Sequence, residues 1–246
     1  DLIHAHYGLS GLFSVIPRGI PVVITFHGSD INFILERQLS KIASRNSAAN
    51  IFVSKKTMKL MPTGNSFFIP CGVDFKIFYQ MDRRTAKQKL DLNDEVKYIL
   101  FSSGFENKVK NYPLAKKAVS ILTVKTGEII ELLELKKYNR EEVALLMNAV
   151  DVALLTSSAE GSPQFIKESM ACNLPIVSTD VGDVKEIIGH VDGCYISSFD
   201  PYDVAEKLNN AIIFGKKTSG CFEVKKFDID VIAHEIVDVY KTLLNH

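Results

Sequence analysis

Two acidic residues, Glu160 and Glu168, stand eight positions apart on either side of a Gly-Ser-Pro turn. The residues just before them, 152–155, are apolar and predict a buried parallel strand. Ser162 is suited to the N-cap of a helix, and Pro163 to its first position. The sequence therefore predicts a strand, a short polar loop that carries Glu160, and a helix that carries Glu168.

The start of this predicted helix is a candidate phosphate site. The first N–H groups of a helix lack partners within the helix, and its N-terminus carries a partial positive charge. Both features favour phosphate where the helix follows a strand. Gly161, Ser162, Pro163 and Gln164 form this terminus, with Glu160 beside it in the loop. We therefore expect these residues to contact an anionic ligand.

Glu168 lies further along the same predicted helix. A lone glutamate on a helix is usually a solvated surface residue, and this alternative applies to Glu168 taken by itself. At about 100° per residue, Glu168 lies roughly 160–200° around the helix from Ile166 and Met170. We expect it to lie off the apolar stripe. The strand, turn and helix around it favour a functional role.

Alternating strand-like and helix-like runs provide the elements that must position these residues. The expected strands are 21–26, 50–54, 66–69, 98–101, 129–135, 151–155, 175–178 and 194–196, and the chain also starts within a strand. The expected helices are 35–46, 114–122, 140–150, 163–172, 184–188, 201–213 and 229–244. This alternation is typical of α/β proteins with parallel sheets.

The composition limits the class of protein. The 246 residues can form one large domain or two modest ones. A formal net charge of zero gives no support for a nucleic-acid partner. No apolar run reaches the ~18 residues of a membrane span. The four cysteines show neither C-x-x-C nor zinc spacing, so we expect free thiols in a reducing cytoplasm.

A domain boundary is expected after the segment 69–74, because the residues from there to about 95 are polar and charged. We place one domain at 1–72, a second at 73–226, and a final helical segment at 227–246. The first part is short for a doubly wound domain, which usually has ~100–200 residues.

Three histidines near the start of the chain are candidate functional residues. His27 follows an apolar strand, and ligands of open parallel sheets bind beyond the carboxyl ends of strands. The alternative is a histidine hydrogen-bonded within a turn. His4 and His6 share one face of a strand. A metal is not expected there, because no third ligand lies nearby in the sequence.

Lys108 and Lys110 follow the strand 98–101 and the turn 102–104. A cation beyond that strand end, facing the helix that starts near Ser162, lies where a diphosphate needs positive charge. Lys110 is the stronger candidate and Lys108 the weaker one. The alternative is a pair of exposed lysines, which is the usual environment of lysine.

Residues 160–183 resemble the E-x7-E signature of the retaining glycosyltransferases of family 4, which have the GT-B fold. The similarity covers the loop 160–163, the helix 167–172, the strand and turn 174–179, and the segment 180–183. It implies two Rossmann-like domains, of which the first is incomplete here, as expected of a fragment that lacks the first strands. It also implies that the helix in 227–246 crosses back toward the N-terminal domain.

The resemblance implies a role for each candidate residue. Glu160 would hold sugar hydroxyls, and Glu168 would accept hydrogen bonds from ribose hydroxyls. Lys110 and the helix terminus would bind the leaving diphosphate. His27 would lie near the transferred sugar and the acceptor.

One family residue is missing. The family usually has an arginine near Gly104, but Phe105 and Glu106 occupy that region here. Lys108 is the nearest spare cation. Arg140 follows a strand at the edge of the expected nucleotide-base region, where a structural role is the stronger expectation.

The resemblance thus implies a metal-independent transferase that moves a sugar from a nucleotide-diphosphate donor to an acceptor hydroxyl with retention, in polysaccharide or glycoconjugate synthesis. It needs no cofactor. The alternatives are a non-catalytic nucleotide-sugar-binding protein and another GT-B enzyme such as a nucleotide-sugar epimerase.

The implied partners are a nucleotide sugar and a saccharide or lipid-linked acceptor, with no nucleic acid. We expect a cytoplasmic protein with at most weak peripheral contact at the inner face of the membrane. The cations of the first part that bear on this contact, Lys41, Arg45, Lys55, Lys56 and Lys59, are read as ordinary solvated surface.

Overall fold

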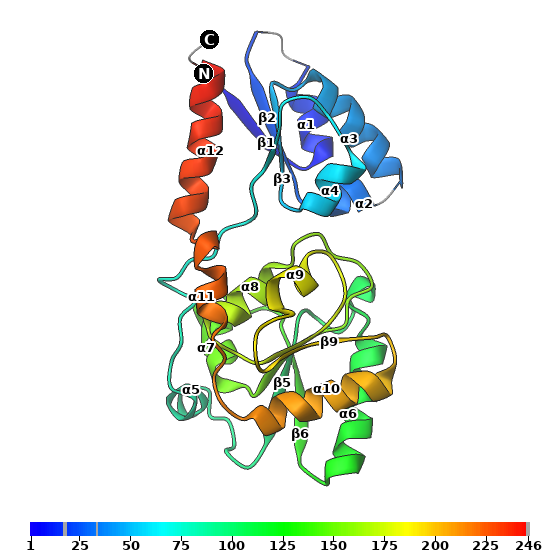
Figure 1. Cartoon of the computed structure of the whole chain (residues 1–246), viewed down its shortest axis with the longest axis vertical. Coiled ribbons are helices and arrows are strands. Elements are labelled where there is room, and N and C mark those ends of the chain that lie inside the picture. The colour runs from blue at the N-terminus through cyan, green and yellow to red at the C-terminus, as the bar shows by residue number, and fades with distance from the viewer. Residues whose placement is uncertain (17–18, 33, 245–246) are drawn as a thin grey trace. The chain divides into compact units, whose positions relative to one another are not determined.

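The computed structural model describes residues 1–16, 19–32 and 34–244, which form two compact units (Figure 1). The first unit comprises residues 1–72, 160–162 and 227–246, and the second comprises 73–159 and 163–226. Each unit contains one fully parallel sheet. The predicted α/β class with two parallel-sheet domains is confirmed.

The first unit has a four-stranded sheet in the order β1-β2-β3-β4. Its strands are β1 (Ile3–His6), β2 (Val22–Phe26), β3 (Ala49–Phe52) and β4 (Ser66–Phe68). The helices that join them are α1 (Gly8–Ser14), α2 (Ser29–Asn32), α3 (Ile34–Asn46) and α4 (Lys55–Leu60). Because neighbouring strands are parallel, their carboxyl ends lie along one edge of the sheet.

Both faces of the first sheet are covered by helices. On one face, Ile24 and Phe26 pack with Ala43 of α3. On the other, α12 (Ile229–Leu244) packs Ile232 and Val239 against the sheet. Figure 1 shows α12, in red, running beside β1. The two faces follow from the alternation of side chains along buried strands.

The second unit has a five-stranded sheet in the order β6-β5-β7-β8-β9. Its strands are β5 (Lys97–Phe101), β6 (Ile130–Glu134), β7 (Val152–Leu155), β8 (Ile176–Thr179) and β9 (Cys194–Ser197). Its helices are α5 (Arg83–Lys89), η1 (Lys108–Lys110), α6 (Tyr112–Thr126), α7 (Arg140–Ala149), α8 (Gln164–Ala171), α9 (Val184–Ile188), α10 (Pro201–Phe214) and α11 (Gly220–Val224), and η2 (Lys225–Phe227) follows at the boundary.

The strand order of the second sheet reverses direction at β5. The chain passes from β5 outward to β6, then returns to the other side of β5 to form β7. In open parallel sheets, ligands bind at the carboxyl ends of strands at such a switch point. The loops after β5 and β7 are therefore the parts of this unit placed to bind a ligand.

The expected strands and long helices all occur, with bounds that differ by a few residues. The short helices α1, α2, α4, α5 and α11 are not among the predicted elements. α5 lies within the segment that was read as a polar hinge, and the Asp82 side chain caps its start by accepting from the Thr85 amide at 2.9 Å. Such helices lack the long apolar repeat that reveals a helix in a sequence. In the described part of the chain, no helix has the length and apolarity needed to cross a membrane.

Candidate functional site

Hydrogen bonds tie together the two loops at the switch point of the second unit. The buried Thr156, just after β7, donates its hydroxyl to the carbonyl of Lys110 at 2.8 Å. The amide of Ser158 donates to the carbonyl of Val109 at 2.9 Å. These bonds hold η1 against the loop that leads into α8.

Lys110 ends η1 and is half-buried, whereas Lys108 is exposed. The Asn107 side chain accepts from the Val109 amide at 3.2 Å and so caps the start of η1. Asn111 follows in the left-handed region at φ 54°, which asparagine tolerates better than most residues. The backbone of η1 is thus restrained on both sides, at Asn107 and at Asn111.

The start of α8 differs from the prediction. Pro163, rather than Ser162, occupies the N-cap position, with φ −68° and ψ 119°, and no side chain caps the helix. The φ of Pro163 would suit the first helical position, but its ψ of 119° is extended, so the helix begins at Gln164, one residue later than expected. The buried hydroxyl of Ser162 has no hydrogen-bond partner among the described residues.

Glu168 is buried, with 7% of its surface exposed, so the expectation that it lies off the buried face is wrong. Residues 165–171 are all buried because α8 packs on β7, β8 and α11, which leaves it no solvent face. Burial raises the pKa of Glu168, and the nearby Arg140 opposes that rise. One carboxylate oxygen of Glu168 lies 3.3 Å from Nη2 of Arg140.

The contact between Arg140 and Glu168 was not predicted from the sequence. Arg140 is the first residue of α7, and its guanidinium lies 5.0 Å from the centre of the Phe78 ring. A capping box fixes this helix start, because Asn139 accepts from the Glu142 amide at 2.9 Å and Glu142 accepts from the Asn139 amide at 2.8 Å. The N-x-x-E pattern predicts the helix start, but nothing in the sequence pairs Arg140 with Glu168.

The region where the family arginine was expected contains an ion pair. Glu106 lies 2.8 Å from Nζ of Lys136, and this contact holds the pKa of the Glu106 carboxyl below its usual range. The amide of Phe105 donates to the Glu134 carboxylate at 3.0 Å. The turn after β5 is therefore fixed by residues that follow or end β6.

In the first unit, three histidines gather at the carboxyl end of the sheet. Nδ1 of His6 lies 2.9 Å from Nε2 of His27, and the rings of His4 and His6 stack at 4.6 Å. Nε2 of His4 lies 2.7 Å from the hydroxyl oxygen of Thr25, and its Nδ1 forms a hydrogen bond with the hydroxyl of Tyr240 on α12. No group of three His, Cys, Asp or Glu side chains placed to hold a metal occurs among the described residues.

Burial keeps two of these histidines neutral. Burial, followed by the charge of a protonated His6, lowers the pKa of His27 from 6.5 to about 4. Burial, followed by the charges of His6 and His27, lowers the pKa of His4 to about 4 as well. At neutral pH both rings therefore have one N–H donor and one lone pair.

We expect acid to destabilise the first unit through these histidines. Between pH 6.5 and about 4, unfolded His4 and His27 bind protons that the folded forms exclude. Stability is thus unaffected by them above the unfolded pKa and falls as the pH drops through this window. Urea unfolding of the chain and of His4→Gln at several pH values is the measurement. The variant should show a shallower fall, and equal pH slopes would contradict the assignment.

The buried Asp30 joins the loops after β1 and β2. Its carboxylate accepts from the amides of Gly8 at 3.1 Å, His27 at 3.1 Å and Gly28 at 2.8 Å. Burial raises the pKa of this carboxyl, and the amide bonds oppose the rise. Next to it, Tyr7 adopts φ 69° and ψ 149°, a strained backbone region that is rare outside glycine. The Asp30 bonds help to hold this turn in place.

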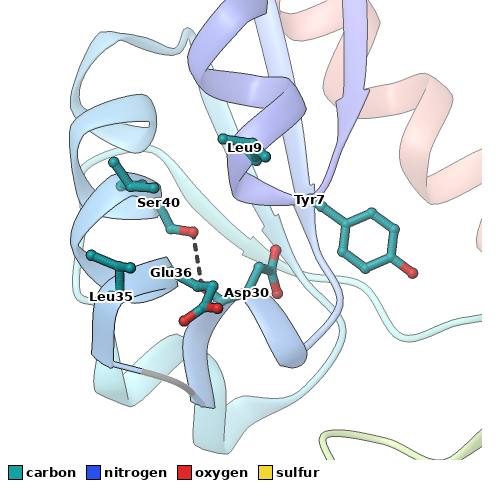
Figure 2. Close-up of a pocket in the computed structure, with 7 residues that line it drawn as sticks. Tyr7, Leu9, Asp30, Leu35, Glu36 and Ser40 are labelled. Carbon is teal, nitrogen blue, oxygen red and sulfur yellow. Dashed lines mark hydrogen bonds between the residues drawn. The ribbon is translucent and has the colours of Figure 1, made fainter.

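A pocket of about 420 Å³ opens beside this turn (Figure 2). It is lined by Tyr7, Leu9, Asp30, Leu35, Glu36, Leu39 and Ser40. The Ser40 hydroxyl donates to the carbonyl of Asp30 at 2.8 Å, as the dashed line in Figure 2 shows. The ring centroids of Tyr7 and His27 lie 4.6 Å apart with the rings tilted by 38°, so Tyr7 borders both the pocket and the histidine cluster.

Two family models match the chain. The model described as Glycosyltransferase Family 4 matches residues 1–76, and the model described as Glycosyl transferases group 1 matches residues 116–213. An uncharacterized glycosyltransferase of Methanocaldococcus jannaschii is 30% identical in an alignment of length 230, and the match covers 85% of this chain and 64% of the relative. A putative teichuronic acid biosynthesis glycosyltransferase of Bacillus subtilis is 27% identical, over 77% of this chain and 55% of the relative.

Solved structures share the fold. Sucrose-phosphate synthase from Thermosynechococcus elongatus has a TM-score of 0.82 at 17% identity, over 99% of this chain and 74% of that one. Anabaena HepE in complex with UDP-glucose has a TM-score of 0.78 at 18% identity, over 98% and 79%. The chain spans 64% or less of the length of the first curated relatives that it matches.

Proposed function

We propose, since the chain belongs to the family 4 glycosyltransferases, that it moves a sugar from a nucleotide-diphosphate donor to an acceptor hydroxyl with retention of configuration. The observation that carries this proposal is the hydrogen bond from Thr156 to the Lys110 carbonyl. It joins η1 to the loop before α8, at the switch point where parallel sheets bind ligands. The hydrogen bond thus links the segment that carries Lys110 to the loop that leads into α8, the two parts that would bind the diphosphate in this proposal.

The leaving diphosphate is the group that most needs stabilisation. In the proposal, Lys110 and the start of α8, with Gly161, Ser162, Pro163 and Gln164, contact it. Negative charge grows on the diphosphate as the sugar bond breaks, so fixed positive groups lower the barrier. The proline at the N-cap supports this role, because a proline side chain has no acceptor of its own for the amides at the start of the helix.

The two carboxylates bind hydroxyl groups in the proposal. Glu168 accepts from ribose hydroxyls, and its burial supports this because a buried carboxylate gains from strong donors. Arg140, 3.3 Å from the Glu168 carboxylate, favours its ionised form and so opposes the effect of burial on its pKa. Glu160 holds hydroxyls of the transferred sugar. Lys108, which is exposed, attracts the donor without a fixed contact.

Retention by same-face attack is the mechanism we propose. A covalent route requires a carboxylate nucleophile close to a second carboxyl group, and the sequence shows no suitably placed second carboxylate. The leaving phosphate then takes the proton of the attacking hydroxyl. The histidine cluster of the first unit, with His27, serves the hydroxyls of sugar and acceptor.

The pocket in Figure 2 supports an acceptor with an apolar part, in favour of the lipid-linked alternative over a free saccharide. Leu9, Leu35 and Leu39 line it. Leu35 is 71% exposed and Phe13 of α1 is 65% exposed, so the first unit also carries apolar side chains at its surface. Burying such side chains against hydrocarbon is favourable by about 25 cal/mol per Å².

Contact with a membrane is proposed to be weak. Lys41 and Arg45, which lie four residues apart on α3, attract anionic lipid, and salt screens that attraction. We expect vesicles rich in anionic lipid to co-sediment the protein at low salt and to release it at high salt. Binding that persists at high salt would mean that the apolar residues of α1 and α3 insert into the bilayer.

Labelled nucleotide sugars, incubated with and without acceptor, test the proposed function. Transfer predicts that nucleoside diphosphate accumulates and that label moves to the acceptor. Binding without turnover would instead support a nucleotide-sugar-binding protein. A changed sugar that remains attached to its nucleotide would support an epimerase.

Metal independence is a further expected result. Excess chelator should leave the transfer rate unchanged, because lysine and helix amides supply the positive charge that the diphosphate needs. The measurement is the initial rate with and without EDTA. Loss of activity on chelation, with recovery in magnesium or manganese, would contradict the account and bring back His4 and His6 as metal ligands.

A further inference from the structure

We propose that His6, rather than His27, presents the imidazole nitrogen that contacts the reacting hydroxyls, and that His27 is its positioning residue. This inference rests on the proposed function, since it names the contact residue of the same reaction. The sequence and the family resemblance both point to His27. The geometry of the first unit points instead to His6, at the end of the neighbouring strand β1.

Both ring nitrogens of His27 face protein atoms. Its Nε2 lies 2.9 Å from Nδ1 of His6, and its Nδ1 lies 4.0 Å from Sγ of Cys71. The Tyr7 ring packs against His27 at 4.6 Å. His27 is half-buried, so a substrate that is to reach one of its nitrogens must first displace a neighbouring side chain.

His6 has the opposite environment. It is exposed, and it ends β1. Its Nδ1 is engaged with His27, and no hydrogen bond to its Nε2 occurs among the described residues. The His4 ring stacks on it at 4.6 Å and limits its rotation. The pair therefore offers one outward nitrogen, Nε2 of His6.

The register of the sheet explains this pairing. His6 lies opposite Thr25 in the parallel pair β1 and β2. His27 follows two residues later, and residues two apart point to the same side of a strand. A neutral imidazole has one donor and one acceptor. The bond between the rings uses one role from each, and His6 keeps the other for a hydroxyl, which can both donate and accept.

Two substitutions of His6 separate contact from positioning. In His6→Gln the amide reaches the place of Nε2, whereas in His6→Asn it reaches the place of Nδ1. The proposal predicts that His6→Gln keeps most of the activity and that His6→Asn loses roughly tenfold or more in kcat, the worth of one hydrogen bond. The reverse order would show that His6 serves only to hold His27. His234→Gln, which removes an exposed histidine on α12, is the matched control.

A chemical measurement tests the geometry without any turnover. Diethyl pyrocarbonate modifies accessible imidazole nitrogens, and peptide mass spectrometry resolves each site. In the unliganded chain, His6 should react faster than His27. Faster reaction of His27 would overturn the proposal even if transfer is detected. Absence of transfer with every nucleotide sugar would overturn the proposed function, and the order of modification would still decide which nitrogen is presented.

Discussion

Replacing Lys110 by alanine is expected to lower kcat about 10²–10³-fold, the usual loss when one preorganised charge-stabilising group is removed. The nucleotide's affinity should change less, because the charge on the diphosphate is greatest while the sugar bond breaks. The loops held by Thr156 should keep their structure, since the bonds to this segment use the backbone carbonyls of Lys110 and Val109, not their side chains. Steady-state kinetics combined with calorimetry of nucleoside diphosphate binding measures both effects.

Lys108→Ala is the matched control for this experiment. Lys108 has the same charge and lies two residues away, but it is exposed. We expect its loss to lower kcat only a few-fold, mainly at low salt, as for other exposed charges. Equal kinetics for Lys110→Ala and the parent chain would contradict the account, and a larger loss in Lys108→Ala would move the phosphate contact to that residue.

Replacing Glu168 by alanine is expected to weaken nucleoside diphosphate binding by ~1.5–3 kcal/mol, the range for hydrogen bonds to a charged group. A position off the apolar stripe, as expected from the sequence, would leave folding unaffected. Because Glu168 is buried beside Arg140, we now expect a lower unfolding temperature as well. Calorimetry and thermal denaturation separate the two effects.

Glu168→Gln serves as the control for the lost side-chain volume. Glutamine fills the same space and keeps hydrogen-bonding atoms, so it should restore most of the stability while affinity stays low. Affinity equal to that of the parent chain in both variants, for every nucleoside diphosphate, would show that Glu168 does not contact ribose and that its pair with Arg140 is structural.

The elements that carry the donor-side residues were predictable from the sequence because their patterns are local. The apolar run of β7, the turn before α8 and the helix itself lie within about twenty residues of one another. The side on which Glu168 lies was not predictable. Helical periodicity separates apolar from polar positions, but α8 is covered by β7, β8 and α11 together, and so its polar positions are buried too.

Contacts between distant segments account for most of what the sequence did not reveal. Arg140 and Glu168 are 28 residues apart in the sequence and meet only in the folded unit, where the first residue of α7 contacts the middle of α8. His6 and His27 meet through the register of two parallel strands. The shared face of His4 and His6 followed from strand periodicity, whereas the partner strand's register depends on packing that no local pattern specifies.

The anomeric configuration of the product tests the central claim most directly. Proton NMR of one sample containing the full-length protein, a nucleotide-diphosphate sugar and an acceptor follows the anomeric signals of donor and product together. The account predicts that the donor signal falls only when acceptor is present, and that the new glycoside has the configuration of the donor. An inverted product, or a donor that stays intact with every nucleotide and acceptor tried, would contradict it.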